Sequence, residues 1–393
     1  MLYRKMPRVK EELSILGFGC MRLPTNGAQI DEAAVVRMMH TAVDNGINYV
    51  DTARPYHGGE SEPCVGRALK GLRDKVQLAT KLPSWLVKSR EDMDSHLNEQ
   101  LRLLQTDHID FYLVHNLPTL EFWEMLLDLG IERWLAEKRA SGQIRWFGFS
   151  FHGAQKDFLA LLEAYDWDFC QIQYNYLDVH YQAGQVGLKA ARAKGLPVIV
   201  MEPLRGGKLA SGLPKDVVQL LRGAEPESSL ASWAFKWLYD QEEVSVVLSG
   251  MNAVEQVQDN LAIAAQAAPG MLSPEQRDLL ANAVGLIKKS YRVPCTGCDY
   301  CMPCPHGVNI PGCFSAYNAR YTQGLITGMS QYVTSTAANH PNQYAGVANC
   351  QSCGVCESKC PQQIAISQGL KEVRRHMEPA WFRLGLKIVN RLT

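Results

Sequence analysis

The sequence predicts an α/β protein in which a (β/α)8 TIM barrel is followed by a small, mainly α-helical domain rich in cysteine. Three observations support this fold. Eight short apolar segments recur at intervals of roughly 30 residues, amphipathic helical patterns lie between them, and the composition changes abruptly to Cys, Gly and Pro from Pro294. Parallel strands that alternate with helices at this spacing can close into a barrel.

The expected strands and helices follow in chain order. Strands are expected at residues 17–20, 48–52, 76–80, 109–114, 145–149, 169–173, 198–202 and 244–248. Helices are expected at residues 92–104, 122–140, 154–164, 182–194, 230–239, 253–267 and 273–289. The last of these helices begins with Ser273-Pro274-Glu275, a common helix start, and the barrel should close there.

An open doubly wound sheet is the alternative fold. It would require a glycine-rich dinucleotide-binding turn after the first strand, but Gly17-Phe18-Gly19-Cys20-Met21-Arg22 lacks the third glycine and a following helix. The barrel is therefore preferred. We expect residues 1–290 to form it and residues 291–393 to form the second domain, with a C-terminal helix over residues 368–392 that docks on the protein.

Composition restricts the class of partner. The chain has 393 residues, 46% of them hydrophobic and 20% charged, which is enough to bury a sizeable core. Its 40 lysines and arginines balance 40 aspartates and glutamates, so no excess of charge points to nucleic acid or a membrane surface. No apolar run approaches the roughly 20 residues of a membrane span, and no signal peptide is visible. We expect a cytoplasmic protein that acts on a small molecule; its oligomeric state is left open.

Polar residues follow three consecutive predicted strands. Asp51 lies at the end of the second strand, with Tyr56 five residues further on, Lys81 follows the third strand and His115 the fourth. Because the carboxyl ends of barrel strands share one face, these side chains are expected to meet in one pocket. Each has an ordinary structural explanation, such as a helix cap or a buried strand-end histidine. Their combination favours catalysis.

These residues carry a resemblance to a known family. With Leu16-Gly17-Phe18-Gly19, Asp51-Thr52-Ala53, Thr80-Lys81 and Gly148-Phe149-Ser150, residues 1–290 resemble the aldo-keto reductase family. The resemblance implies a catalytic tetrad of Asp51, Tyr56, Lys81 and His115. It also implies reduction of a small carbonyl compound with hydride from NADPH or NADH.

Elementary chemistry gives each tetrad member a task. A carbonyl that accepts hydride becomes an alkoxide and needs a proton donor, but a free tyrosine with a pKa of about 10 is a weak acid. The ammonium of Lys81, held by Asp51, is expected to lower the pKa of Tyr56. His115 is expected to orient the substrate carbonyl.

The resemblance further implies a nicotinamide nucleotide site at the barrel mouth. Ser150 and Gln171 would bind the carboxamide, loops after the last two strands would lie near the phosphates, and Gln256 and Asn260 would lie on the adenosine side, unless they are ordinary helix surface. The full set is Gly19, Cys20, Met21, Asp51, Ser150, Gln171, Met201, Pro203, Leu204, Arg205, Gly206, Gly207, Ser249, Gly250, Met251, Gln256 and Asn260.

Three positions depart from the family pattern. Met201 stands where many relatives have a tyrosine that stacks on nicotinamide, and Phe151 follows Ser150 where an asparagine is common. Gly250 and Gln256 supply no charge for a 2′-phosphate, so NAD and NADP both remain candidates. Arg205 and Lys208 are basic residues that can supply that charge.

Two cysteine motifs end in Cys-Pro. The second is Cys350-x2-Cys353-x2-Cys356-x3-Cys360-Pro361, the spacing of bacterial [4Fe–4S] ferredoxins, and the first is Cys295-x2-Cys298-x2-Cys301-x2-Cys304-Pro305. In two-cluster ferredoxins the cysteine before proline ligates the other cluster. We therefore expect one [4Fe–4S] cluster on Cys295, Cys298, Cys301 and Cys360, and a second on Cys350, Cys353, Cys356 and Cys304. Zinc bound by the same thiols is the alternative.

The region around these motifs resembles an α-helical dicluster ferredoxin, with a helix expected at residues 314–329. Cys20, Cys64, Cys170 and Cys313 lie outside the motifs and are expected to be small buried hydrophobes. Trp85 and Trp123 are candidates for lining the substrate pocket.

Joining the two halves poses a problem of electron count. Nicotinamide gives up two electrons together, whereas each cubane passes one, so a flavin or a radical-tolerant substrate is needed for exchange between them. No motif supports a flavin site, although Met201, Arg205 and Phe151 are compatible with one. The leading hypothesis is an aldo-keto reductase coupled by its clusters to a ferredoxin-like electron partner. The alternatives are a carbonyl reductase whose clusters are structural or sense oxidation, and a non-catalytic nucleotide-binding redox-sensor subunit.

Overall fold

The computed structural model describes residues 1–6, 8–338, 344–379 and 382. The chain forms two compact units. The first consists of Met1–Leu204 and Ala231–Pro274, and the second of Arg205–Leu230 and Glu275–Thr393. Hydrogen bonds tie the two segments of the second unit together, from Gln276 Nε2 to Glu225 Oε1 at 2.8 Å and from the Tyr291 hydroxyl to the Gly212 carbonyl at 3.1 Å. Residues 205–230 were expected in the barrel domain. In the structure they belong to the same compact unit as the cysteine-rich segment.

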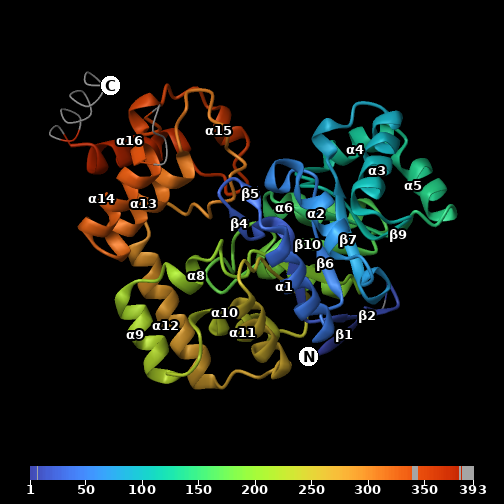
Figure 1. Ribbon diagram of the computed structural model, residues 1–393, viewed down its shortest axis with the longest axis horizontal. Helices are drawn as coiled ribbons and strands as arrows, with labels where there is room; N and C mark the ends of the chain where they lie inside the picture. The colour runs from blue at the N-terminus through green and yellow to red at the C-terminus, as the bar shows by residue number, and fades with distance from the viewer. Residues whose placement is uncertain (7, 339–343, 380–381, 383–393) are drawn as a thin grey trace. The chain divides into compact units, whose positions relative to one another are not determined.

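The first unit is a closed barrel of eight parallel strands, which confirms the predicted fold class (Figure 1). The strands are β3 (Leu16–Gly19), β6 (Tyr49–Asp51), β7 (Gln77–Leu82), β8 (Ile109–Val114), β9 (Ile144–Phe151), β10 (Phe169–Gln173), β11 (Val198–Met201) and β12 (Val244–Ser249). Each pairs with the next along the chain, and β12 pairs back with β3, with Val247 opposite Leu16. Every expected strand overlaps one of these eight.

Helices connect the barrel strands. They are α1 (Glu32–Asp44), α2 (Ser61–Ala68), α3 (Arg90–Leu104), α4 (Leu120–Asp128), α5 (Ile131–Ala140), α6 (Gln155–Ala164), α7 (Gly184–Ala193), α10 (Leu230–Tyr239) and α11 (Val254–Ala265). The single helix expected at residues 122–140 is in fact two, because Gly130 between them has φ of 80°. A backbone conformation of this left-handed kind, which glycine adopts easily, ends a helix.

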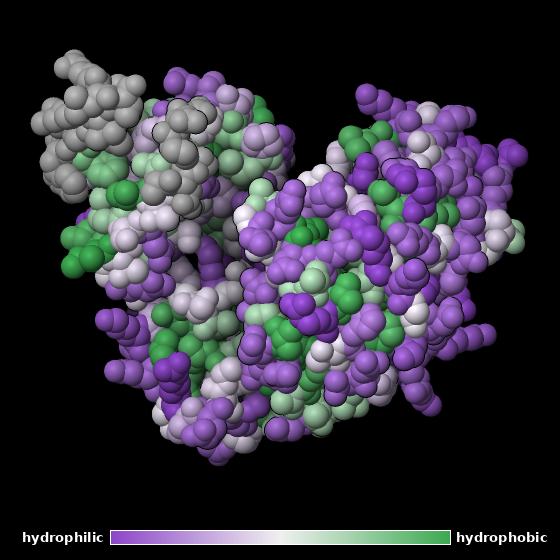
Figure 2. Space-filling view, in the orientation of Figure 1, coloured by the Kyte–Doolittle hydropathy of each residue, from purple (hydrophilic) through white to green (hydrophobic). Residues whose placement is uncertain are grey.

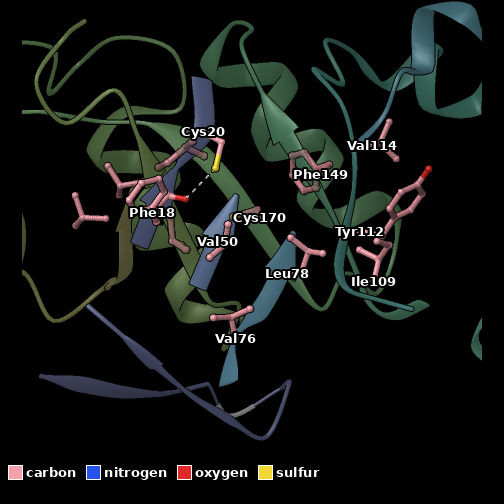
Figure 3. Close-up of a cluster of buried hydrophobic side chains, with 14 of the residues drawn as sticks. Phe18, Cys20, Val50, Val76, Leu78, Ile109, Tyr112, Val114, Phe149 and Cys170 are labelled. Carbon is pink, nitrogen blue, oxygen red and sulfur yellow. Dashed lines mark hydrogen bonds between the residues drawn. The ribbon is translucent and has the colours of Figure 1, made fainter. Parts of the chain in front are cut away.

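Alternate strand residues face two separate hydrophobic clusters. Figure 3 shows part of the larger one, in which Val50 and Cys170 lie among residues that face the helices. Their neighbours Tyr49 and Phe169 belong to the barrel's interior cluster. An unpredicted hairpin of β1 (Tyr3–Met6) and β2 (Glu11–Ser14) adds side chains to that interior cluster. Arg4 donates to the carbonyl of Val244, the first residue of β12, so the hairpin covers the amino-terminal end of the barrel.

The second unit is mainly α-helical, as predicted. It contains α8 (Lys208–Ser211), α9 (Lys215–Ala224), α12 (Pro274–Ser290), α13 (Ile310–Thr322), α14 (Leu325–Val333), α15 (Val355–Ser358) and α16 (Ile366–Met377). The single helix expected at residues 314–329 is wrong, because Gly324, with φ of 108°, separates α13 from α14. The expected C-terminal helix coincides with α16 in its first part and lies largely outside the described residues beyond it.

The surface is hydrophilic, as expected for a chain with 20% charged residues. The face drawn in Figure 2 is largely hydrophilic, with scattered hydrophobic side chains. Over the described ranges, no helix is long and apolar enough to cross a membrane.

Candidate active site

The structure brings the four predicted catalytic side chains together at the carboxyl ends of neighbouring strands. Asp51 ends β6, Tyr56 begins the short turn that follows, Lys81 lies in β7 and His115 directly follows β8. Lys81 Nζ donates to Asp51 Oδ1 at 2.7 Å and lies 3.4 Å from the Tyr56 hydroxyl oxygen. The Tyr56 and His115 rings meet edge to face, with centroids 6.2 Å apart. The four residues therefore form one continuous group.

Lys81 and Asp51 are a buried ion pair, with relative exposures of only 1% and 2%. Lys81 Nζ also donates to the Thr52 carbonyl at 2.8 Å, and Gln171 Nε2 donates to the second carboxylate oxygen of Asp51 at 3.0 Å. Satisfying the remaining atoms in this way is what allows a buried pair to persist. The ammonium is consequently held at a defined position below the Tyr56 hydroxyl.

The pKa of Tyr56 differs from the sequence-based expectation. Burial, and next the negative charge of Asp51, raise the pKa of Tyr56 well above its ordinary value. The expected lowering by Lys81 is therefore wrong for this structure, because burial of the Tyr56 hydroxyl has the largest effect on its pKa. Tyr56 is accordingly a neutral phenol near pH 7, and a neutral phenol can donate a proton.

His115 is also neutral. Burial lowers the pKa of His115 well below its ordinary value, and the charges of Lys81 and His152 lower it further. A neutral imidazole carries one N–H donor. The indole of Trp85 lies 5.1 Å from the His115 ring and is 43% exposed, and its place in a substrate pocket stays a prediction. Trp123 does not line that pocket, because it is buried against Trp167 at 4.6 Å.

The residues expected at the nicotinamide show a fitting arrangement. Ser150 and Gln171 lie side by side on β9 and β10. Ser150 Oγ accepts a hydrogen bond from the Asn116 backbone N–H at 2.8 Å. Gln171 Oε1 is buried and has no hydrogen-bond partner within the part of the chain that the structure describes. A buried acceptor without a donor is costly, and the amide N–H of a nicotinamide carboxamide would satisfy it.

Other expected nucleotide contacts lie at several strand ends. Gly19 ends β3, and a side chain there would lie 3.3 Å from the Ser249 carbonyl at the end of β12. Asn260 Nδ2 donates to Ser249 Oγ at 2.9 Å, so this residue fastens α11 to β12. Gln256 Oε1 accepts from the Asn252 N–H at 2.9 Å, in the loop that contains Gly250 and Met251.

The remaining members of that set differ in their surroundings. Cys20 is fully buried, its thiol 4.0 Å from the Phe18 carbonyl (Figure 3), whereas Met21 beside it is partly exposed. Met201 ends β11, and Pro203 and Leu204 follow it. Arg205, Gly206 and Gly207 belong to the second unit, and their role at a nucleotide stays a prediction.

A buried polar network that the sequence did not suggest supports the strand that carries Lys81. Gln100 Nε2 donates to the Lys81 carbonyl at 3.0 Å and to Glu62 Oε1 at 2.7 Å. Thr80 Oγ1 donates to the same glutamate oxygen at 2.7 Å, and the Tyr112 hydroxyl donates to Gln100 Oε1 at 2.8 Å. The sequence offered one signal for this network, a glutamine at position 100 on the buried face of an amphipathic helix. The hydrogen-bond partners of Gln100 become clear only in the structure, where α2 and α3 pack on β7.

Replacing Gln100 with leucine is expected to lower the free energy of barrel unfolding by roughly 1–3 kcal/mol, because Glu62 loses a buried donor. Urea unfolding followed by tryptophan fluorescence measures the change. Asn98→Leu, at an exposed position of the same helix, is the matched control and should leave the midpoint almost unchanged. Equal midpoints for the two variants would contradict the network's role.

Four motif cysteines of the second unit share one pocket. Cys295, Cys298, Cys301 and Cys360 line one pocket, together with Pro361 and apolar residues of α13 and α16. Burial raises the pKa of the Cys356 thiol, and the nearby Cys304 and Cys350 thiols add to this rise. Cys353 is exposed. Cys360 of the second motif thus lies at the pocket of the first motif, whereas the second set of ligands stays a prediction.

The pocket of Cys295, Cys298, Cys301 and Cys360 combines four cysteines with apolar residues such as Ile310, Pro311 and Phe314. Cysteine thiolates are the ligands that hold a [4Fe–4S] cluster, so these residues fit one. Zinc bound by the same thiols stays the alternative.

Known proteins show similarities to both parts of the chain. Residues 15–269 match the aldo/keto reductase family, and residues 294–365 match a 4Fe-4S dicluster domain. The Bacillus subtilis protein YrpG, an uncharacterized oxidoreductase, is 32% identical over 232 residues, which cover 53% of this chain and 68% of YrpG.

Solved structures agree with the barrel. The holo form of aldo-keto reductase AKR11C1 from Bacillus halodurans superposes with a TM-score of 0.59 at 28% identity, covering 72% of this chain and 96% of that one. An aldo/keto reductase from Klebsiella pneumoniae in complex with NADP and acetate gives a TM-score of 0.56 at 26% identity, covering 70% and 92%.

Proposed function

Because the chain belongs to the aldo/keto reductase family and carries a 4Fe-4S dicluster domain, we propose that it reduces the carbonyl group of a small molecule with hydride from NADPH or NADH. We further propose that two [4Fe–4S] clusters couple this activity to a ferredoxin-like electron partner. The observation that carries the proposal is the position of Lys81 Nζ, within hydrogen-bond distance of both Asp51 and the Tyr56 hydroxyl.

The proposed reaction divides the work among the tetrad. A bound nicotinamide supplies the hydride, two electrons and one proton, to the carbonyl carbon. The neutral His115 donates a hydrogen bond to the carbonyl oxygen and orients it. As negative charge develops on that oxygen, Tyr56 transfers its phenolic proton there, and the product is an alcohol. The Lys81 ammonium then stabilises the tyrosinate until solvent returns a proton, while Asp51 keeps the ammonium in place.

The nucleotide part of the proposal is supported by Gln171. Its Nε2 is committed to Asp51, and its buried Oε1 is left without a donor in the described part of the chain. A carboxamide bound here would bring the nicotinamide ring beside the carboxylate that holds Lys81. The same glutamine would therefore position both the hydride source and the ion pair.

The iron–sulfur part rests on the eight thiols and the dicluster match. Bound clusters would store and pass single electrons. Cys295, Cys298, Cys301 and Cys360 would hold one of them in the pocket that they line, and Cys350, Cys353, Cys356 and Cys304 would hold the other. Nicotinamide releases two electrons at once, so a mediator such as an added flavin is included in the test.

The test uses full-length protein purified without oxygen. Reduced nucleotide and a panel of small aldehydes and ketones are added, and alcohol formation is compared with nucleotide oxidation. Equal amounts of both are expected, and no alcohol with either nucleotide across the panel would overturn carbonyl reduction. Reduced nucleotide is then mixed with oxidised clusters, with and without flavin. Visible absorption that never bleaches would overturn the coupling.

The rate of carbonyl reduction is expected to stay level from about pH 7 to pH 9, below the ordinary tyrosine pKa of about 10. Burial and Asp51 raise the pKa of Tyr56, so its proton is lost, and activity with it, only as the pH rises through that raised value. The lowered pKa of His115 keeps the imidazole neutral over the same range. A profile of kcat against pH measures this. A fall in kcat centred between about pH 7 and pH 9 would show that Tyr56 is more acidic in the complex with substrate and nucleotide.

A further inference from the structure

Two basic side chains are bound to the start of the first cysteine motif, although they lie far from it in the sequence. Lys208 Nζ donates to the Cys295 carbonyl at 2.7 Å. Arg205 Nη2 donates to the carbonyl of the preceding residue, Pro294, at 3.1 Å. All of these residues belong to the second unit. The segment that follows β11 is thus attached to the loop that presents the first thiol.

Arg205 and Cys295 lie in a poorly hydrated environment, whereas Lys208 is partly exposed. Arg205 is only 3% exposed, and its guanidinium lies 5.9 Å from the centre of the Tyr291 ring. Cys295 is 9% exposed. Because charges interact more strongly where water is excluded, a positive charge held at this loop stabilises negative charge on the Cys295 sulfur.

We propose that Lys208 and Arg205 raise the reduction potential of the cluster on Cys295, Cys298, Cys301 and Cys360. This inference rests on the cluster assignment in the proposed function. Reduction adds one electron and no proton, so the reduced site carries one more negative charge than the oxidised site. A fixed positive charge nearby stabilises the reduced form more, and local charge is one of the factors that set such potentials.

The geometry also gives Lys208 and Arg205 different roles. Lys208 donates with its ammonium to the carbonyl of Cys295, a proposed ligand residue. Arg205 is held between the Pro294 carbonyl and the Tyr291 ring and supports the loop from the buried side. Lys208 is the better residue for a test, because Arg205 is more deeply packed.

The experiment is a redox titration of the full-length protein, loaded with clusters, in which electron paramagnetic resonance follows the reduced clusters. In Lys208→Met, one of the two midpoint potentials is expected to fall by about 59 mV, which is a tenfold change in the reduced-to-oxidised ratio for one electron. The other potential should not move. Lys208→Arg, which keeps the charge, should restore the parent value. Lys215→Gln, at an exposed position on α9, should leave both potentials unchanged.

Iron and sulfide analysis separates this inference from the proposed function. A parent protein without two clusters would refute the function on which the inference rests. A full complement of iron and sulfide in Lys208→Met, with both potentials unchanged, would overturn the inference itself. If Lys208→Met loses the first cluster, Lys208→Gln, which keeps a donor without the charge, is titrated instead. An unchanged potential in that variant counts equally against the inference.

Discussion

Replacing Tyr56 with phenylalanine is expected to lower kcat for carbonyl reduction by about 10²–10⁴-fold, the usual contribution of a positioned acid. The substitution removes one hydroxyl and keeps the ring, whose edge-to-face contact with His115 and position 5.0 Å from Lys81 Nζ do not depend on that hydroxyl. Without the phenol, the nascent alkoxide must take its proton from water. Steady-state kinetics under anaerobic conditions measure the loss.

The affinity for reduced nucleotide should stay within about twofold of the parent in Tyr56→Phe, because the residues expected to bind it, such as Gln171, are unchanged. Tyr49→Phe is the matched control. It removes a buried hydroxyl from the interior cluster of the same barrel and should leave kcat unaffected. Equal kcat values for Tyr56→Phe and the parent would rule out Tyr56 as the acid.

Replacing Cys360 with alanine is expected to remove about half of the bound iron and sulfide, because one of two cubanes loses a ligand. The second motif supplies Cys360, yet its thiol lines the pocket of Cys295, Cys298 and Cys301. The cluster that remains should therefore be the one held mainly by the second motif. Iron and sulfide analysis gives the loss, and the paramagnetic resonance signal of the reduced protein identifies the surviving cluster.

Cys313→Ala is the control for this experiment. Cys313 is fully buried in the core of the same unit and lies outside both motifs, so its replacement should leave iron and sulfide at the parent level. Undiminished iron and sulfide in Cys360→Ala would contradict the crossed pattern. Zinc in place of iron, without sulfide, would contradict the clusters altogether.

The sequence predicted most of the architecture because its strongest signals are local. Apolar strand segments at regular spacing indicated the barrel, and the closure of β12 on β3 confirmed it. The two helix predictions that failed did so at Gly130 and Gly324, where one glycine with a positive φ interrupts a continuous apolar pattern. Periodicity alone does not reveal such a break, because the hydrophobic face continues on both sides of it.

The candidate site was predicted in part. Residues that follow consecutive strands were foreseen together, since the topology of a parallel barrel brings strand ends to one face. The supporting residues Glu62 and Gln100 were missed, because they lie on helices and the local sequence does not predict what those helices pack against. Trp123 was misassigned for the same reason, since its burial against Trp167 depends on how α4 packs.

The sequence by itself determined the order of the strands, the four polar residues at or just after the ends of three of them, and the spacing of eight cysteines. Each of these depends on neighbours along the chain. Only the tertiary structure decided that burial and Asp51 raise the pKa of Tyr56, and that Lys208 binds the carbonyl of Cys295. Electrostatic effects depend on distance in space and on the exclusion of water, and both arise only when segments far apart in the chain have packed together.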